Sequence, residues 1–281
     1  MTVHLPQTGE AGPIGVFDSG YGGLTVLREI RRTLPQYDYL YLGDNARAPY
    51  GTHSFEVVYE FTLQAVRYLF GQGCHLVILA CNTASAKALR TIQQVDLPKL
   101  DSKRRVLGVI RPTVEVVGDI STTRHVGIMA TPGTIRSNTY ELEIAKLWPD
   151  IQVTGEPCPM WVPLVENDEH NSPGADYFVR KRTESLLQRD PLIDSIILGC
   201  THYPMLLGKI RKYIPEDIHI IEQGNYVAQS LKGYLARHPD MEKCITTEGT
   251  ARFLTTEQAD LFGEKASIFM GESLVAERVK L

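Results

Sequence analysis

The sequence predicts an α/β protein made of two similar halves, each built on a mostly parallel sheet. Short apolar runs alternate with longer amphipathic stretches along the 281 residues, which is typical of βα units. In addition, two strand-end motifs recur in the same order later in the chain. Eight runs are expected to be strands: 14–17, 39–42, 76–80, 106–110, 126–129, 151–153, 196–198 and 218–221.

The segments between these strands have helical patterns. Apolar residues at four positions between 24 and 34 lie near one face of a predicted helix. Ser54 is in position to cap a second helix that carries a long apolar face. A further short helix is expected after the proline at position 204.

The recurring motifs indicate that the two halves are related. Residues 14–20 resemble residues 126–133, and residues 78–83 resemble residues 197–202. An apolar strand followed by small residues occurs in many parallel sheets, so chance similarity is the alternative. Two matches in the same order favour duplication, with the two halves facing each other across a cleft.

The composition of the chain argues against several classes of protein. The chain has 29 basic and 33 acidic residues, a balance that argues against nucleic-acid or anionic-membrane binding. Its apolar runs are too short to cross a bilayer. Residues 1–13 lack the basic and apolar regions of a secretion signal, and the five cysteines form an odd set. We therefore expect a cytoplasmic protein with reduced thiols.

Polar side chains follow four predicted strands, at the ends where parallel α/β sheets bind ligands. They are Asp18 with Ser19, Asp44, Cys81 with Asn82 and Thr83, and Cys200 with Thr201 and His202. The glycine-rich loop 18–23 precedes a helix, so its amides could bind an anion; a purely structural tight turn is equally consistent. The loop has neither the dinucleotide-binding nor the Walker spacing.

Cys81 and Cys200 are the most informative of these residues. A single buried cysteine is usually inert, but each of these ends a strand and precedes a helix, whose N-terminus favours the thiolate. Facing halves would put the two sulfurs on opposite walls of one cleft. One thiolate could then remove a proton from a carbon while the opposite thiol protonates its other face, inverting the stereocentre.

Other interpretations of the two cysteines fit less well. A disulfide is unusual in a reducing compartment, and Cys200 with His202 supplies too few ligands for a metal. A nucleophilic Cys200 assisted by His202 would leave Cys81 unused. Cys74, Cys158 and Cys244 are assigned no role.

Six segments of the chain, between residues 14 and 207, match motifs of a known family in order. They are 15–28 (GVFDSGYGGLTVLR), 41–51 (YLGDNARAPYG), 80–89 (ACNTASAKAL), 130–137 (ATPGTIRS), 157–166 (PCPMWVPLVE) and 198–207 (LGCTHYPMLL). The third and sixth together are highly specific. On these segments the chain resembles the glutamate racemases of the aspartate/glutamate racemase superfamily. These are cofactor-independent isomerases (EC 5.1.1.3) that supply D-glutamate for bacterial peptidoglycan, and hence for the cell wall and cell shape.

The resemblance implies a role for each matching position. Cys81 and Cys200 would be the acid/base pair, with Asp18 beside Cys81 and His202 beside Cys200. Glu166 and Asp44 would support the site. Substrate binding would fall to Asp18, Ser19, Tyr50, Gly51, Asn82, Thr83, Thr131, Thr134, Thr201 and His202. Neutral donors of this kind suit the two carboxylates of glutamate.

The resemblance also implies architecture and partners. Residues 1–103 with 216–281 would form one half, and residues 104–215 the other, closing on glutamate without a cofactor or a metal. A homodimer in the cytoplasm is expected. Two alternatives stay open: a racemase for aspartate or another amino acid, and a two-domain protein that binds an amino acid without chemistry.

Overall fold

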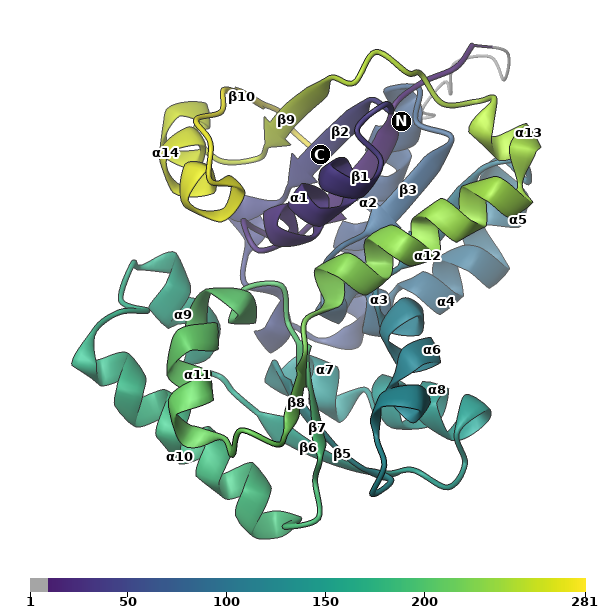
Figure 1. Cartoon of the computed structure of the whole chain (residues 1–281). Helices are drawn as coiled ribbons and strands as arrows, with labels where there is room; N and C mark the ends of the chain where they lie inside the picture. The colour runs from purple at the N-terminus through teal and green to yellow at the C-terminus, as the bar shows by residue number, and fades with distance from the viewer. Residues whose placement is uncertain (1–9) are drawn as a thin grey trace.

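The computed structural model describes residues 10–281 and contains two parallel sheets, one in each half of the molecule (Figure 1). Residues 1–9, which carry most of the segment used to judge a secretion signal, lie outside the described residues. Every strand pairs in parallel with its neighbours. The predicted fold class is therefore confirmed.

The larger sheet has six strands in the order β10-β9-β2-β1-β3-β4. Its strands are β1 (Ile14–Asp18), β2 (Tyr39–Gly43), β3 (Leu76–Leu79), β4 (Arg105–Gly108), β9 (Ala251–Thr255) and β10 (Ala276–Arg278). The first four were predicted. The strands β9 and β10 were missed because they are short and combine apolar with charged residues, which leaves no clear period.

Helices cover both faces of this sheet. They are α1 (Gly23–Thr33), α2 (Phe55–Gly71), α3 (Asn82–Lys87), α4 (Leu89–Thr91), α5 (Leu97–Leu100), α12 (Gln223–Arg237), α13 (Pro239–Glu242) and α14 (Ala259–Met270), with short turns of helix at Asn45–Arg47, Tyr50–Thr52 and Ile92–Asp96. Apolar residues of α1, α12 and α14 pack on one face and those of α2 on the other. The Ser54 hydroxyl accepts a hydrogen bond from the backbone amide of Val57 (3.3 Å), which confirms the predicted cap.

The smaller sheet has four strands in the order β6-β5-β7-β8. Its strands are β5 (His125–Ala130), β6 (Gln152–Pro157), β7 (Ser195–Gly199) and β8 (His219–Ile221). Its helices are α6 (Ile110–Ile120), α7 (Pro132–Arg136), α8 (Thr139–Leu147), α9 (Trp161–Glu166), α10 (Pro173–Arg189) and α11 (Leu207–Tyr213), the last preceded by a helical turn at Tyr203–Leu206. Residues of α6 and α8 pack on one face, and those of α10 and α11 on the other.

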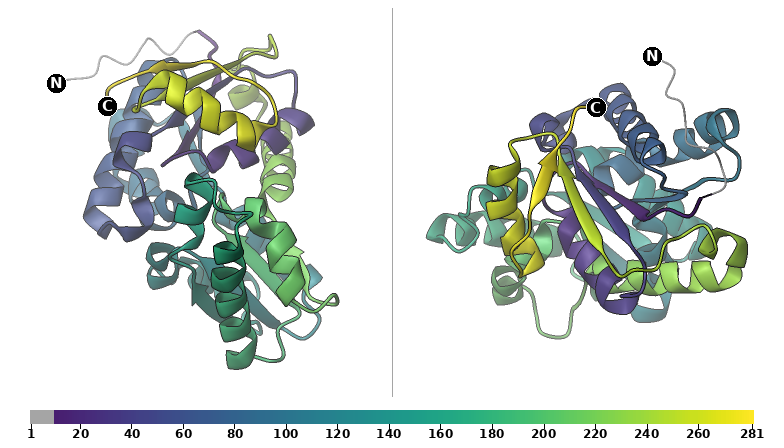
Figure 2. Two further views of the ribbon diagram at one scale, coloured as in Figure 1. Left: turned by 90° about the vertical axis from the view of Figure 1, so that its left-hand side faces the viewer. Right: turned by 90° about the horizontal axis from the view of Figure 1, so that it is seen from above.

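The chain changes sheet twice, a few residues later than predicted. Residues 105–108 form β4 beside β3, although the predicted boundary after residue 103 placed them in the second half. Residues 219–221 form β8 beside β7, although the boundary after residue 215 placed them in the first half. An apolar edge strand looks the same in either sheet, so only the pairing decides its place. Figure 2 shows the two halves from two further directions.

Within residues 10–281, no helix combines the length and the apolar character that a bilayer span requires.

Candidate active site

A buried pocket of about 100 Å³ lies where the two sheets direct the carboxyl ends of their strands toward each other. Loops that follow β1, β3, β5, β6 and β7 all contribute to its wall. Cys81 and Cys200 both line it, and each is less than a tenth exposed. The predicted juxtaposition of the two cysteines at one site is thus what the structure shows.

Cys81 lies two residues after the end of β3 and caps helix α3. Its Sγ accepts a hydrogen bond from the backbone amide of Ala84 (3.4 Å) and lies 3.4 Å from the hydroxyl of Ser19. Burial raises the pKa of the Cys81 thiol to about 12, and the nearby carboxylate of Asp18 adds to the increase. At neutral pH this sulfur therefore carries its proton.

Cys200 has a different partner, a charged histidine. Its Sγ lies 3.9 Å from Nδ1 of His202, and Nε2 of the same ring lies 3.0 Å from Oε1 of Glu166. Burial alone would lower the pKa of His202, but the bonds to Cys200 and Glu166 outweigh it and raise the pKa to about 10. At neutral pH the ring is an imidazolium, so a positive charge lies next to the sulfur of Cys200.

Asp18 lies between the two cysteine loops. It accepts hydrogen bonds from the amide of Gly20 (2.9 Å) and from the hydroxyl of Thr201 (3.4 Å). Burial raises the pKa of this carboxyl, although the charge of His202 opposes the shift. Asp18 thus acts on the charge of Cys81 and contacts the Cys200 loop as well.

The glycine loop packs directly on the Cys200 loop. A Cβ atom at Gly22 would stand 2.3 Å from the Thr201 hydroxyl oxygen and 2.4 Å from Nδ1 of His202, so only glycine allows this approach. The structural interpretation of the loop therefore holds for Gly22, while Ser19 of the same loop lines the pocket.

Three threonine hydroxyls meet at the other end of the pocket. The oxygens of Thr83, Thr131 and Thr134 lie 3.1–3.2 Å from one another, and they come from α3 of one half and from the start of α7 in the other. Each hydroxyl can donate one proton. A cluster of neutral donors within a buried pocket is suited to a carboxylate.

Some of the predicted site residues stand behind the pocket rather than on its wall. Asp44 is fully buried and accepts hydrogen bonds from the Tyr50 hydroxyl, the Arg47 guanidinium (2.7 Å) and the Thr256 hydroxyl (2.9 Å). It therefore holds Tyr50, which does line the pocket. Asp18 and Thr134 likewise contact lining residues without lining the pocket themselves.

Several wall residues were missed from the sequence: Pro49, Thr52, Pro132, Cys158, Pro159, Val162 and Pro163. Cys158 directly follows β6, at the same sheet edge as the other polar motifs, so the strand-end rule could have found it. Among the described residues, no three His, Cys, Asp or Glu side chains are grouped so as to hold a metal ion.

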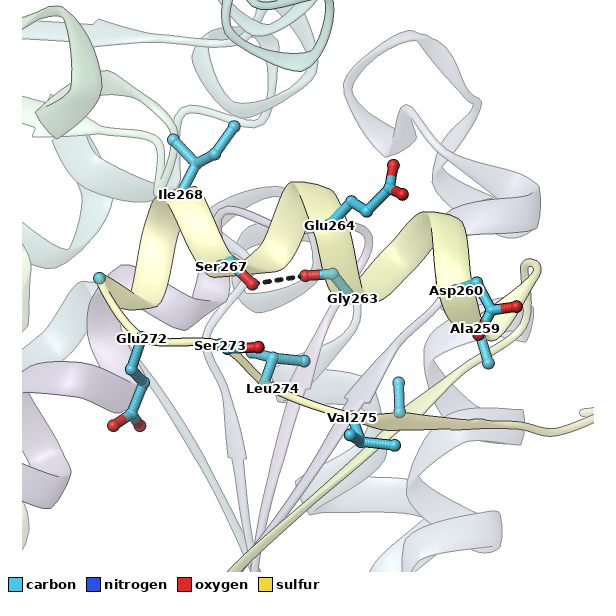
Figure 3. Close-up of a pocket in the computed structure, with 12 residues that line it drawn as sticks. Ala259, Asp260, Gly263, Glu264, Ser267, Ile268, Glu272, Ser273, Leu274 and Val275 are labelled. Carbon is cyan, nitrogen blue, oxygen red and sulfur yellow. Dashed lines mark hydrogen bonds between the residues drawn. The ribbon is translucent and has the colours of Figure 1, made fainter.

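A larger hollow of about 900 Å³ lies between α14 and residues 271–276 (Figure 3). Its charged lining residues are Asp260, Glu264 and Glu272, and no thiol or cation lines it. The Ser267 hydroxyl donates to the carbonyl oxygen of Gly263 in its own helix, so it is already satisfied. This open hollow has none of the chemistry of the cysteine pocket.

Comparison with known proteins agrees with this geometry. The sequence model of the Asp/Glu/hydantoin racemases matches residues 14–230. The chain belongs to this racemase family. It is 42% identical to the glutamate racemase of Dinoroseobacter shibae over 267 residues, which cover 92% of this chain and 95% of that protein.

Solved structures of glutamate racemases have the same fold. An isoform from Bacillus anthracis aligns with a TM-score of 0.87 at 33% identity, and the Francisella tularensis enzyme in complex with D-glutamate with a TM-score of 0.84 at 32% identity. Each alignment covers 96% of this chain and 98% of the other. The protein is accordingly an isomerase of the glutamate racemase family.

Proposed function

We propose that this protein interconverts L- and D-glutamate with two thiols and no cofactor. One observation carries the proposal: Cys81 and Cys200, from two different sheets, line the same small buried pocket. The Francisella tularensis relative was solved with D-glutamate, which supports glutamate as the ligand of this chain too.

The proposed reaction is a proton exchange at Cα. A thiolate takes the α-proton from one face of the substrate, which leaves a carbanion, and the opposite thiol gives its own proton to the other face. The two thiols then have exchanged protonation states. Cys81, protonated at neutral pH, is the donor in one direction, and Cys200, beside the His202 imidazolium, is the corresponding base.

Surrounding residues complete the proposed machinery. Asp18 adjusts the charge at Cys81, while His202 with Glu166 adjusts it at Cys200, and Asp44 acts through Tyr50. The substrate would be held by lining residues and by the threonine cluster, with backbone amides after β1 and β3 as further donors. A free amino acid is weakly acidic at Cα, so burial and many donors are needed to stabilise the carbanion.

The test is incubation of the purified protein with L-glutamate and, separately, with L-aspartate while optical rotation is recorded. Rotation should decay with glutamate. Decay with aspartate alone would move the protein to the alternative racemase activity. Glutamate binding without exchange of the α-proton in D₂O would instead identify a binding protein without chemistry.

The proposal extends to the cell. We propose that the D-glutamate is made in the cytoplasm for peptidoglycan, that the two halves are domains that close on the substrate, and that the enzyme is a homodimer. Expression should restore growth to a bacterium that requires added D-glutamate, and light scattering of the purified protein should give twice the mass of the chain.

A further inference from the structure

Three buried side chains form a closed ring of hydrogen bonds next to Cys81. Nδ2 of Asn82 donates to Oε1 of Gln223 (2.5 Å), Nε2 of Gln223 donates to the Tyr140 hydroxyl (2.8 Å), and that hydroxyl donates to Oδ1 of Asn82 (2.7 Å). Each of the three is less than 5% exposed. We call this set, Asn82, Tyr140 and Gln223, the amide ring.

Which atom donates and which accepts in each hydrogen bond of the amide ring follows from one neighbouring group, the backbone carbonyl of Val109. Nε2 of Gln223 also lies 3.3 Å from the backbone oxygen of Val109, which can only accept. The amide nitrogen must therefore face Val109, so the amide oxygen faces Asn82 and accepts from it. The Asn82 oxygen is then left to accept from Tyr140. The ring uses Oδ1 and one of the two hydrogens of Nδ2 of Asn82, which also lines the pocket, so its role in substrate binding stays a prediction.

The amide ring joins the two halves of the molecule. Asn82 begins α3 at the end of β3 in the six-stranded sheet, whereas Tyr140 lies in α8 on the four-stranded sheet. Gln223 is the first residue of α12, the helix by which the chain returns from β8 to the six-stranded half (Figure 1). The ring thus lies at a crossing between the halves that present the two cysteines.

Cys81 is coupled to the ring through helix α3. Its Sγ accepts from the amide of Ala84 in the first turn of that helix, in which Asn82 is the first residue. A shift of this turn would therefore move the sulfur. Proton transfer is sensitive to such shifts, because a misplacement of about 1 Å can cost about 100-fold in rate.

We propose that Tyr140 and Gln223 are positioning residues, which hold the first turn of α3 so that Sγ of Cys81 is placed against the face of the substrate opposite Cys200. The inference rests on the proposed racemisation. Neither residue lines the pocket, so both act through Asn82 and Cys81.

The test compares Tyr140→Phe and Gln223→Leu with Gln93→Leu. Gln93 is a matched control because its Nε2 donates to a backbone oxygen, that of Val106, away from the pocket. We expect kcat/KM to fall about 10- to 100-fold in the two ring variants. Because both remove the same ring, the double variant should lose little more than either alone. Gln93→Leu should lower only the melting temperature.

Isotope effects separate positioning from simple destabilisation. With α-deuterated glutamate, Tyr140→Phe should enlarge the primary isotope effect on kcat/KM for the enantiomer that Cys81 deprotonates and leave the other unchanged. Tyr140→Phe removes only a hydroxyl, so the fold is retained even if Gln223→Leu unfolds. Wild-type isotope effects in both directions, together with a lower melting temperature, would overturn the proposal. An inactive wild-type protein would overturn the racemase function instead.

Discussion

The two cysteines occupy equivalent places in two sheets but differ in their surroundings. Cys81 has a serine hydroxyl and a backbone amide at its sulfur, and burial, together with the charge of Asp18, raises its pKa. Cys200 has an imidazole at its sulfur, and that ring is held by Glu166. The two similar strand ends therefore have different electrostatic environments: Cys81 is a buried thiol near a carboxyl group, whereas the sulfur of Cys200 has an imidazolium beside it.

This difference supports the proposed reversible proton exchange within one pocket. Two identical thiols would both be protonated at neutral pH, since a free thiol has a pKa of about 8.5. A protonated Cys81 facing a Cys200 with an imidazolium beside it gives the pocket two sulfurs in different surroundings, as the proposed exchange requires.

Removing either sulfur should have the largest effect. Cys81→Ala and Cys200→Ala should each abolish racemisation, because each variant leaves one face of the substrate without a group that can carry the proton. Serine in either position should leave at most proton exchange in one direction, measured by NMR in D₂O. Cys244→Ala, which changes a thiol remote from the pocket, is the control and should keep full activity. An active alanine variant at position 81 or 200 would contradict the two-thiol scheme.

Changing the neighbour of each sulfur should have the next largest effect. Asp18→Asn and His202→Asn should each lower kcat/KM about 100-fold, the size typical of acid/base assistance. The two enantiomers are equally stable, so kcat/KM must fall equally in both directions. The difference between the two directions of the reaction should appear in kcat and in the primary isotope effect.

These two variants should differ in which enantiomer is affected. The isotope effect should grow for one enantiomer in Asp18→Asn and for the opposite one in His202→Asn. The same enantiomer affected in both variants would show that the two residues do not serve different sulfurs.

A threonine lies two residues after Cys81 and another directly after Cys200, and the two offer a finer contrast. Thr83 belongs to the hydroxyl cluster, whereas the Thr201 hydroxyl donates to Asp18. We expect Thr83→Val to raise KM about tenfold, since a hydrogen bond to a charged group contributes about 1.5–3 kcal/mol. Thr201→Val should lower kcat with little change in KM. Steady-state kinetics with both enantiomers tests this expectation. If both variants changed KM and kcat in the same way, the two hydroxyls would have the same function.

The last expected effect is on folding rather than on catalysis, and it appears as a loss of stability at high pH. The folded-state pKa of His202, about 10, exceeds its ordinary value of 6.5, so its contribution is complete below pH 6.5 and is lost as pH rises toward 10. The wild-type free energy of unfolding should thus fall by up to about 1.4 kcal/mol per pH unit in this window. Urea unfolding of His202→Asn should show a shallower decline. Equal slopes would mean that folding does not raise this pKa.

Much of the site was predictable from local pattern. Cys81 and Cys200 each follow an apolar strand, and parallel strands bring their carboxyl ends to one edge. The Ser54 cap and the first four strands follow from equally local signals. The contact of His202 with Glu166 was not derivable from spacing, because Glu166 lies in a different helix, α9.

Other features depended on which surfaces pack together. Gln223 belongs to no motif, and its role appears only because α12 begins beside Asn82 and Tyr140. Asp44 follows a strand as the site residues do, yet it is turned toward Tyr50 and Arg47. The strand-end rule gives the sheet edge at which a residue lies but not the direction of its side chain.

The sequence by itself determined the alternation of strands and helices and the polar residues at the strand ends, since periodicity and chain direction are local properties. The tertiary structure alone decided that the sulfur of Cys81 lies near the Ser19 hydroxyl and that the histidine beside Cys200 is held by Glu166. The reason is physical: partners distant in the chain are brought together by the packing of helices on sheets, and burial then sets the strength of their charges.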